Sequence, residues 1–301
     1  MRLQKTPNPS GVRRFAQRGI FSRQITVSSQ QMSYALISSF DPSALDDFRS
    51  LRGKGGHVEK GLFIAEAPKI VRKVLTSALA IESAFMTPEF FEEMKPLFEA
   101  REDTTDVYLA PKSEMEKIVG YNLHQGVMLA VRIPANRILD AASLTWKHPF
   151  QVLALDSIAD AENMGAMIRN AAAFGVDAVL VDDQSCSPFL RRSVRVSMGT
   201  ITDVEIIRVP DLASALHSLK SLHPCLVVGA ALGTETKDLR TITVPSNCVI
   251  VFGSEGWGLR PEVSNKCDLL ASIAMADEID SLNVAIASGI FLYALQHATN
   301  G

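Results

Sequence analysis

The segment 152–181 restricts the fold of this chain more than any other, because two short apolar runs flank a helical pattern in it. The first run, 152–155, ends at Asp156, and after a polar stretch small and apolar residues continue to Gly175. The second run covers 178–181. Short apolar runs bounded by polar residues are typical of buried strands, and the order strand–helix–strand builds a parallel sheet. The sequence therefore predicts an α/β fold.

Arg169 is the unusual residue in the helical part of this segment. Its neighbours are mostly apolar, which predicts a buried helix, and a buried guanidinium needs a polar partner. Gly165 lies one turn earlier on the same helix face. We therefore expect the Arg169 side chain to extend over Gly165 toward a loop that carries Asn163. The alternative from these residues alone is a packing glycine with a structural ion pair.

The composition is that of a globular protein of about two domains, not of a membrane protein. No apolar run reaches the length of about 18 residues that a membrane span requires. The spacing of the cysteines contains no C-x-x-C pair, so it predicts neither a metal site nor a disulfide framework, and it favours the cell interior. These cysteines are Cys186, Cys225, Cys248 and Cys267.

Residues 1–40 differ from the rest of the chain, because they hold six basic residues and no acidic one. The composition is typical of an organellar transit peptide. A disordered basic tail, with a true start at Met32, explains it equally well, and a basic arm on RNA phosphates is a third option. The predicted location is intracellular: the cytoplasm, or a mitochondrion or plastid if this leader is a transit peptide. The remaining residues are more acidic than basic, so any contact with nucleic acid must come from local patches.

The pattern of residues 46–132 predicts a small α/β domain. The segment 133–148 contains proline and polar residues and is predicted to be a linker. Before the first strand, Arg49 and Arg52 lie in a basic loop with several glycines. Such a loop can follow a phosphate backbone, although a solvated loop explains it as well. The predicted strands are 62–65, 81–86, 107–110 and 127–131, and the predicted helices are 68–79, 88–100 and 112–119.

Residues 149–301 predict a second α/β domain built on the opening segment. The helix predicted at 187–197 carries Arg191, Arg192 and Arg195, which are either RNA contacts or a solvated helix face. The further predicted strands are 204–209, 225–230, 248–252 and 269–275, and the further helices are 212–222 and 284–297.

Polar loops follow three of these strands, at 156–163, 253–259 and 276–283. In open parallel sheets, ligands bind beyond the carboxyl ends of the strands. Glycines in the second loop allow a close backbone approach, and the scarcity of basic groups suits an adenosine better than a polyphosphate. The P-loop, the dinucleotide fingerprint and the nucleophile elbow are absent, which argues against nucleotide hydrolysis and serine hydrolase chemistry.

Each of these loop residues also has a purely structural interpretation. Asp280 or Ser281 is expected to cap the last helix. Asn283 is then a first-turn residue without a further task, and Glu255 caps the following helix or pairs with Arg260.

Three motifs occur in order along the chain: N-M-G-x3-R at 163–169, G-S-E-G-x-G-L at 253–259 and S-L-N-V at 281–284. Together they resemble the SpoU (TrmH) family of RNA ribose methyltransferases. The resemblance covers about 150–298, and 46–132 resembles the substrate-binding domain of that family more loosely. Glu66-Ala67 departs from the Glu-Gly that relatives usually carry, and residues 1–40 lie outside the match.

This resemblance implies a homodimer that transfers a methyl group from S-adenosylmethionine to a ribose 2′-hydroxyl of RNA, with ribosomal RNA favoured over transfer RNA. It also implies a trefoil knot in the C-terminal domain, which general connection rules would not predict. No metal is expected. The implied cofactor-binding residues are Gly253, Ser254, Ile273, Met275 and Leu282. The implied catalytic residues are Asn163, Arg169, Glu255, Ser281 and Asn283.

Arg169 is the residue that the family assigns to handling the hydroxyl proton. Because a free guanidinium stays protonated, our hypothesis is that Arg169 binds the target phosphate and stabilises the developing oxyanion. Replacement of Gly165 by Leu is expected to block the path of the arginine and abolish transfer in a folded protein. A catalytically silent RNA-binding homologue and a base methyltransferase on the same fold are the alternative functions.

Overall fold

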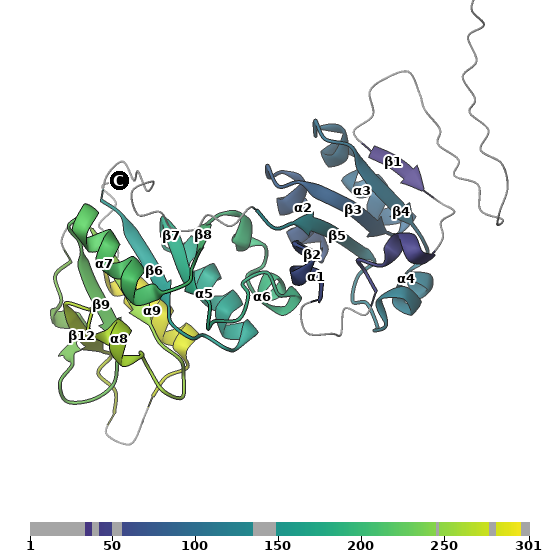
Figure 1. Cartoon of the computed structure of the whole chain (residues 1–301). Helices are drawn as coiled ribbons and strands as arrows, with labels where there is room; N and C mark the ends of the chain where they lie inside the picture. The colour runs from purple at the N-terminus through teal and green to yellow at the C-terminus, as the bar shows by residue number, and fades with distance from the viewer. Residues whose placement is uncertain are drawn as a thin grey trace, which may run out of the picture.

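The computed structural model describes residues 34–37, 42–49, 56–134, 149–244, 247–276 and 281–295, which form two α/β domains (Figure 1). The N-terminal domain contains a five-stranded sheet and the C-terminal domain a seven-stranded sheet. Within the described residues, no helix is both long and apolar enough to cross a membrane. The predicted linker is described only at Ile133 and Pro134. The fold class predicted from the sequence is thus confirmed, while the knot stays a prediction.

The N-terminal sheet has the strand order β1-β4-β3-β5-β2. In it β5 runs antiparallel to both of its neighbours, while the other pairs are parallel. Its strands are β1 (Tyr34–Ile37), β2 (Leu62–Glu66), β3 (Ile81–Met86), β4 (Thr105–Leu109) and β5 (Val127–Arg132). Its helices are η1 (Pro42–Leu45), α1 (Gly56–Glu59), α2 (Pro68–Leu75), α3 (Pro88–Glu99) and α4 (Lys112–Val119).

Two predictions for this domain need correction. Strand β1 lies inside the segment 1–40, so the predicted leader extends too far along the chain. This strand has only four residues and is held by its pairing with β4, which the sequence of such a short run does not reveal. Helix α2 ends before the predicted residue 79, because the Thr76 hydroxyl hydrogen-bonds back to the carbonyl oxygen of Arg72 and the chain turns there.

The C-terminal sheet is parallel throughout and has the strand order β10-β12-β9-β11-β6-β7-β8. Its strands are β6 (Gln151–Leu155), β7 (Ala178–Asp182), β8 (Glu205–Val209), β9 (Leu226–Ala230), β10 (Lys237–Asp238), β11 (Cys248–Phe252) and β12 (Leu269–Ser272). Its helices are α5 (Ala161–Ala173), α6 (Arg191–Val196), η3 (Thr200–Thr202), α7 (Leu212–Leu222), η4 (Leu239–Thr241), α8 (Pro261–Ser264) and α9 (Val284–Leu295).

The strand order of this sheet positions the site. Strands β6 and β11 are adjacent in register from 151 to 155 and from 248 to 252, and both are completely buried. Their apolar runs therefore form the centre of the core, as predicted. Because the two strands are parallel, the polar loops that follow them leave the sheet at the same edge.

Helix α6 is shorter than predicted. Ser187 does not cap it; its side chain and carbonyl instead accept hydrogen bonds from Phe189 and Leu190 in a separate turn. The helix begins only at Arg191. It lies at the junction of the two domains, beside β2 (Figure 1).

Aromatic and charged contacts hold the two domains together at this junction. The ring centroids of Phe63 in β2 and Phe189 before α6 are 5.5 Å apart. Lys73 of α2 forms an ion pair with Asp203 of the C-terminal domain. The N-terminal sheet is therefore packed against α6 of its own chain.

Candidate active site

Helix α5 starts at a polar cap that places Asn163 in its first turn. The Asp160 side chain accepts hydrogen bonds from the backbone N–H groups of Glu162 (2.8 Å) and Asn163 (2.9 Å), which is the usual N-cap arrangement. The prediction that Asn163 belongs to a loop is wrong, because this cap begins the helix two residues before Asn163. The Asn163 side chain nevertheless reaches the neighbouring loop.

Asn163, Glu255 and Asn283 join side chains from three distant segments, and we call them the amide–carboxylate cluster. The Nδ2 atoms of Asn163 and Asn283 donate to Oε1 of Glu255 over 2.8 and 2.9 Å. Asn283 Nδ2 also lies 2.9 Å from Asn163 Oδ1. No described residue donates to Oε2 of Glu255. The cluster therefore ties α5 to the 253–259 loop and to the start of α9, and it retains one free carboxylate oxygen.

Asn283 has a second task as the cap of α9. Its Oδ1 accepts hydrogen bonds from the backbone N–H groups of Ala285 (2.9 Å) and Ile286 (3.3 Å). The prediction that Ser281 caps this helix is wrong, and Asp280 lies outside the described residues. Asn283 suits both tasks because an amide has an acceptor for the helix and donors for Glu255.

A cavity of 680 Å³ opens beside this cluster. It is enclosed by the end of β9, the 253–259 loop, the residues after β12 and the first turns of α9. All five residues implied in cofactor binding line it, as do Glu255, Ser281 and Asn283: the five are Gly253, Ser254, Ile273, Met275 and Leu282. The structure thus brings together in one place most of the residues that the motifs indicate.

Gly253 is required for the shape of this cavity. A Cβ atom at this position would lie 2.1 Å from the backbone carbon of Gly258 and 2.3 Å from the backbone nitrogen of Leu259. The loop folds back on itself through paired hydrogen bonds of 3.1 and 2.9 Å between Ser254 and Gly258. Any side chain at Gly253 would force this loop away from the strand end.

The cavity fits S-adenosylmethionine in size and in chemistry. Ligand pockets of about 300–1,000 Å³ are usual for molecules of this size. Apolar groups from Phe252, Ile273 and Phe291 suit an adenine, and Glu255 is the only charged side chain among the described residues that line the cavity. One carboxylate in a neutral lining is compatible with a sulfonium and offers no site for a polyphosphate.

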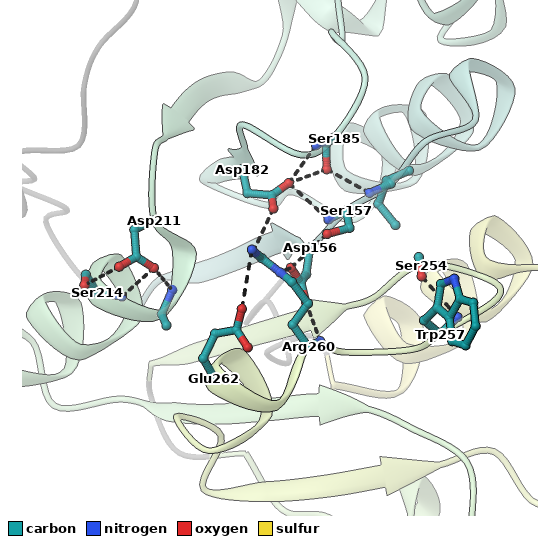
Figure 2. Close-up of polar contacts among 12 residues, drawn as sticks. Asp156, Ser157, Asp182, Ser185, Asp211, Ser214, Ser254, Trp257, Arg260 and Glu262 are labelled. Carbon is teal, nitrogen blue, oxygen red and sulfur yellow. Dashed lines mark hydrogen bonds and ion pairs between the residues drawn. The ribbon is translucent and has the colours of Figure 1, made fainter.

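A second polar network lies beyond the same strand ends, and we call it the Arg260 network (Figure 2). The guanidinium of Arg260 contacts Asp156 over 2.5 Å and Asp182 over 2.8 Å. Asp156 also accepts the backbone N–H of Arg260 over 2.8 Å, and both aspartates are buried. Although burial opposes the charge on Arg260, the hydrogen bond and charge of Asp156 and the charge of Asp182 raise its pKa.

The Arg260 network was missed from the sequence, which offered Glu255 as the partner of Arg260. The missed signal is that Asp156 and Asp182 terminate adjacent parallel strands, β6 and β7, and therefore point to the same edge. Arg260 follows the 253–259 loop and fastens its end to the sheet. Glu255 is thereby left for the amide–carboxylate cluster.

Arg169 does not lie where we expected it. The side chain is exposed on α5, and none of the described residues forms a hydrogen bond or an ion pair with it. A Cβ atom at Gly165 would lie 2.4 Å from the carbonyl oxygen of Ser193. The backbone of α6 thus occupies the face over which Arg169 was expected to extend, and Gly165 is a packing glycine. A leucine at position 165 would therefore meet α6 before it met the Arg169 side chain, and loss of transfer in a Gly165→Leu protein would not report on the path of the arginine.

The basic residues predicted to bind RNA differ in their availability. Arg191 donates to Glu66 of β2 over 2.8 and 2.9 Å and lies 4.1 Å from the ring centroid of Tyr121, so it joins the two domains. Arg192 pairs with Glu162 (2.5 Å). The remaining ones are Arg49, which pairs with Asp46 over 2.9 Å, Arg195, which is exposed, and Arg52, which lies outside the described residues.

Comparison with known proteins places these features in a family. The model of the SpoU rRNA Methylase family matches residues 151–293. The 23S rRNA (guanosine-2′-O-)-methyltransferase RlmB of Acinetobacter baylyi is 35% identical over 189 residues, which is 62% of this chain and 76% of the relative. An uncharacterised tRNA/rRNA methyltransferase of Mycobacterium bovis is 31% identical over 264 residues, or 84% of this chain and 88% of the relative.

Solved structures agree over both domains. The AdoMet-bound rRNA methyltransferase from Sinorhizobium meliloti superposes with a TM-score of 0.72 at 25% identity, covering 87% of this chain and 97% of that one. The three motifs, the sheet order and this likeness lead to one conclusion: the chain belongs to the SpoU rRNA methylase family.

Proposed function

We propose that this protein methylates the ribose 2′-hydroxyl of a guanosine in large-subunit ribosomal RNA. Membership of the family makes the chain an S-adenosylmethionine-dependent RNA 2′-O-ribose methyltransferase. The finer choice of substrate is supported by the relative from Acinetobacter baylyi, whose substrate is 23S rRNA. A ribosomal RNA substrate also supports the intracellular location predicted from the sequence.

The single observation that carries this proposal is the amide–carboxylate cluster on the wall of a cavity that fits the cofactor. When bound, the cofactor supplies a methyl group on a positively charged sulfur. Glu255 is held by two amide donors, so its free Oε2 can accept a hydrogen bond from the ribose hydroxyl. Orienting the hydroxyl oxygen toward the methyl group is the main requirement of an in-line displacement.

Arg169 is proposed to contact the RNA outside the cofactor cavity. It lines neither the 680 Å³ cavity nor a neighbouring cavity of 460 Å³ bordered by Glu162, Asn163 and Asn283. Its exposed guanidinium, without a partner in the described residues, is available to a phosphate of the RNA. Replacement by alanine should leave cofactor affinity unchanged and abolish methylation.

A homodimer through α9 is also proposed. Ile286, Ile290 and Tyr293 form an exposed apolar stripe at helical spacing on this helix. Such a stripe is typical of an interface with another apolar surface. Light scattering should give twice the chain mass, and an aspartate at Ile290 should reduce it to that of a single chain.

Nucleoside analysis by mass spectrometry tests the proposed function. The purified protein is incubated with the cofactor and either ribosomal or transfer RNA, and the digested nucleosides are examined for the position of the new methyl group. We expect 2′-O-methylguanosine from 23S rRNA. A methyl group on a base would support a base methyltransferase, methylated transfer RNA would change the substrate, and binding without transfer would indicate a silent homologue.

A further inference from the structure

Trp257 is the most exposed large apolar residue in the described part of the protein, with 94% of its surface accessible to solvent. It lies in the 253–259 loop, two residues after Glu255, and it lines the mouth of the cofactor cavity. Leu232, exposed to 61%, lines the same cavity. Two exposed apolar side chains that border one ligand cavity offer a surface that a planar ligand can cover.

The main chain under Trp257 is held in place although the ring is free. Ser254 and Gly258 are joined by two backbone hydrogen bonds, and the Ser254 hydroxyl accepts the backbone N–H of Trp257 over 3.2 Å (Figure 2). No described residue accepts a hydrogen bond from the indole. Trp257 also stands apart from the Arg260 network in Figure 2, so it takes no part in fastening the loop.

The surroundings favour a nucleobase over the cofactor as the group that covers the ring. The inner wall of the cavity already supplies apolar contacts from Phe252, Ile273 and Phe291. A ring that is almost wholly exposed faces solvent, from which the RNA arrives. The neighbouring charged side chain is Glu255, which disfavours a phosphate, whereas unpaired bases stack on aromatic rings regardless of their sequence.

We propose that Trp257 stacks on an unpaired base of the substrate RNA next to the target ribose, and so selects nucleotides in single-stranded segments. This inference rests on the proposed function, because it concerns the RNA that the same site methylates. The stacked base would fix the ribose beside Glu255 while leaving cofactor binding unchanged.

Fluorescence provides a readout that does not depend on catalysis. The chain has two tryptophans, so the variant Trp146→Phe leaves Trp257 as the single reporter. We expect a short single-stranded RNA to quench its emission, and the same strand in a duplex or S-adenosylmethionine alone to leave it unchanged. The inference would be overturned if the cofactor alone quenched the emission. It would also be overturned if single-stranded RNA failed to quench it.

Kinetics with matched variants completes the test. Replacement of Trp257 by alanine should raise the KM for RNA by about 5- to 150-fold, the range expected for one lost stacking contact. The Kd for S-adenosylmethionine should stay within about twofold, and Trp257→Phe should restore most of the loss. Leu222→Ala on α7, another exposed apolar residue, should change neither constant.

The outcomes separate this inference from the proposed function. An unchanged KM in Trp257→Ala, while the wild type forms 2′-O-methylguanosine, would overturn stacking alone. Quenching by single-stranded RNA in a protein that methylates no RNA would support stacking and contradict the proposed function. A raised Kd for the cofactor with an unchanged KM for RNA would assign Trp257 to the cofactor and overturn stacking.

Discussion

The Arg260 network and the amide–carboxylate cluster lie beyond the same strand ends, but they treat charge in opposite ways. In the Arg260 network, the buried Asp156 and Asp182 are both paired with one guanidinium. In the cluster, the described residues hold the exposed Glu255 carboxylate by amides alone and leave one of its oxygens without a donor. The comparison teaches that one site can divide its tasks: a paired charge holds the loop, and an unpaired charge faces the cavity.

The two groups are connected through the 253–259 loop. Glu255 lies inside this loop and Arg260 directly after it, so the sheet fixes one end of the segment that presents the carboxylate. Variants in the Arg260 network should therefore mainly alter stability, and variants in the amide–carboxylate cluster should mainly alter catalysis.

Among variants of the two groups, Glu255→Ala should give the largest effect on catalysis. Loss of the carboxylate removes the proposed acceptor for the ribose hydroxyl, and we expect kcat to fall by about 10²- to 10⁴-fold. The free energy of unfolding should fall by only about 1–2 kcal/mol, because the Glu255 side chain is exposed while the buried Asn163 amide loses its acceptor. Glu255→Gln is the matched control that keeps the shape. A kcat within twofold of wild type would show that the cluster is only structural.

Asp156→Ala should give the largest effect on stability. It removes the buried carboxylate that accepts hydrogen bonds from Nε and from the backbone N–H of Arg260. Asp182 still pairs with the guanidinium, so we expect a loss of about 3 kcal/mol, at the lower end for a broken buried pair. Denaturant unfolding would measure this loss, and Asp183→Ala, which breaks the exposed pair with Arg208, should cost about 0–1 kcal/mol. Equal losses in the two variants would contradict the distinction between the groups.

Gly165→Ala should produce an intermediate effect on both properties. The new Cβ atom would meet the backbone of Ser193 at 2.4 Å, so α5 must shift on α6 at a cost of about 1–3 kcal/mol. Asn163 lies two residues earlier in the same helix, and methylation should fall with stability. Gly56→Ala is the matched control, because it makes the same substitution at the start of α1, where no atom lies within 4 Å of the new Cβ atom and φ is not positive. If a destabilised Gly165→Ala protein methylated RNA at the wild-type rate, the position of the amide–carboxylate cluster would not depend on how α5 packs against α6.

Ala67→Gly should give the smallest effect, and it should be a gain. Ala67 has φ 85° and ψ 142°, a region that glycine adopts far more readily than alanine. Relief of this strain, reduced by the entropy of glycine in the unfolded chain, should stabilise the protein by about 1 kcal/mol. Thermal unfolding would detect it, while kcat should stay unchanged because Ala67 is distant from both groups in the chain and belongs to the N-terminal sheet domain. A lower melting temperature would show that the strain estimate is wrong.

Most of the fold could be predicted, because a short apolar run indicates a buried strand and apolar residues at helical spacing indicate a helix, and both patterns are local. The strands at β3 and β11 and the helices α4 and α7 begin and end as the pattern indicates. Predictions failed where a boundary depends on a particular hydrogen bond, as at Ser187 before α6, or where pairing supplies the stability of a short strand, as at β1. The site residues other than Arg169 could be grouped, because parallel strands bring the following loops to one edge.

The sequence by itself determined the parallel sheet, the three polar loops and the family, since these depend on local patterns and motif order. Only the tertiary structure decided the partners of each charged residue. Arg260 pairs with Asp156 and Asp182 instead of Glu255, Arg191 joins the domains through Glu66, and α6 covers Gly165. The physical reason is that a charge or a bare glycine face accepts whichever group packing brings within a few ångströms, and the spacing of residues along the chain does not specify that group.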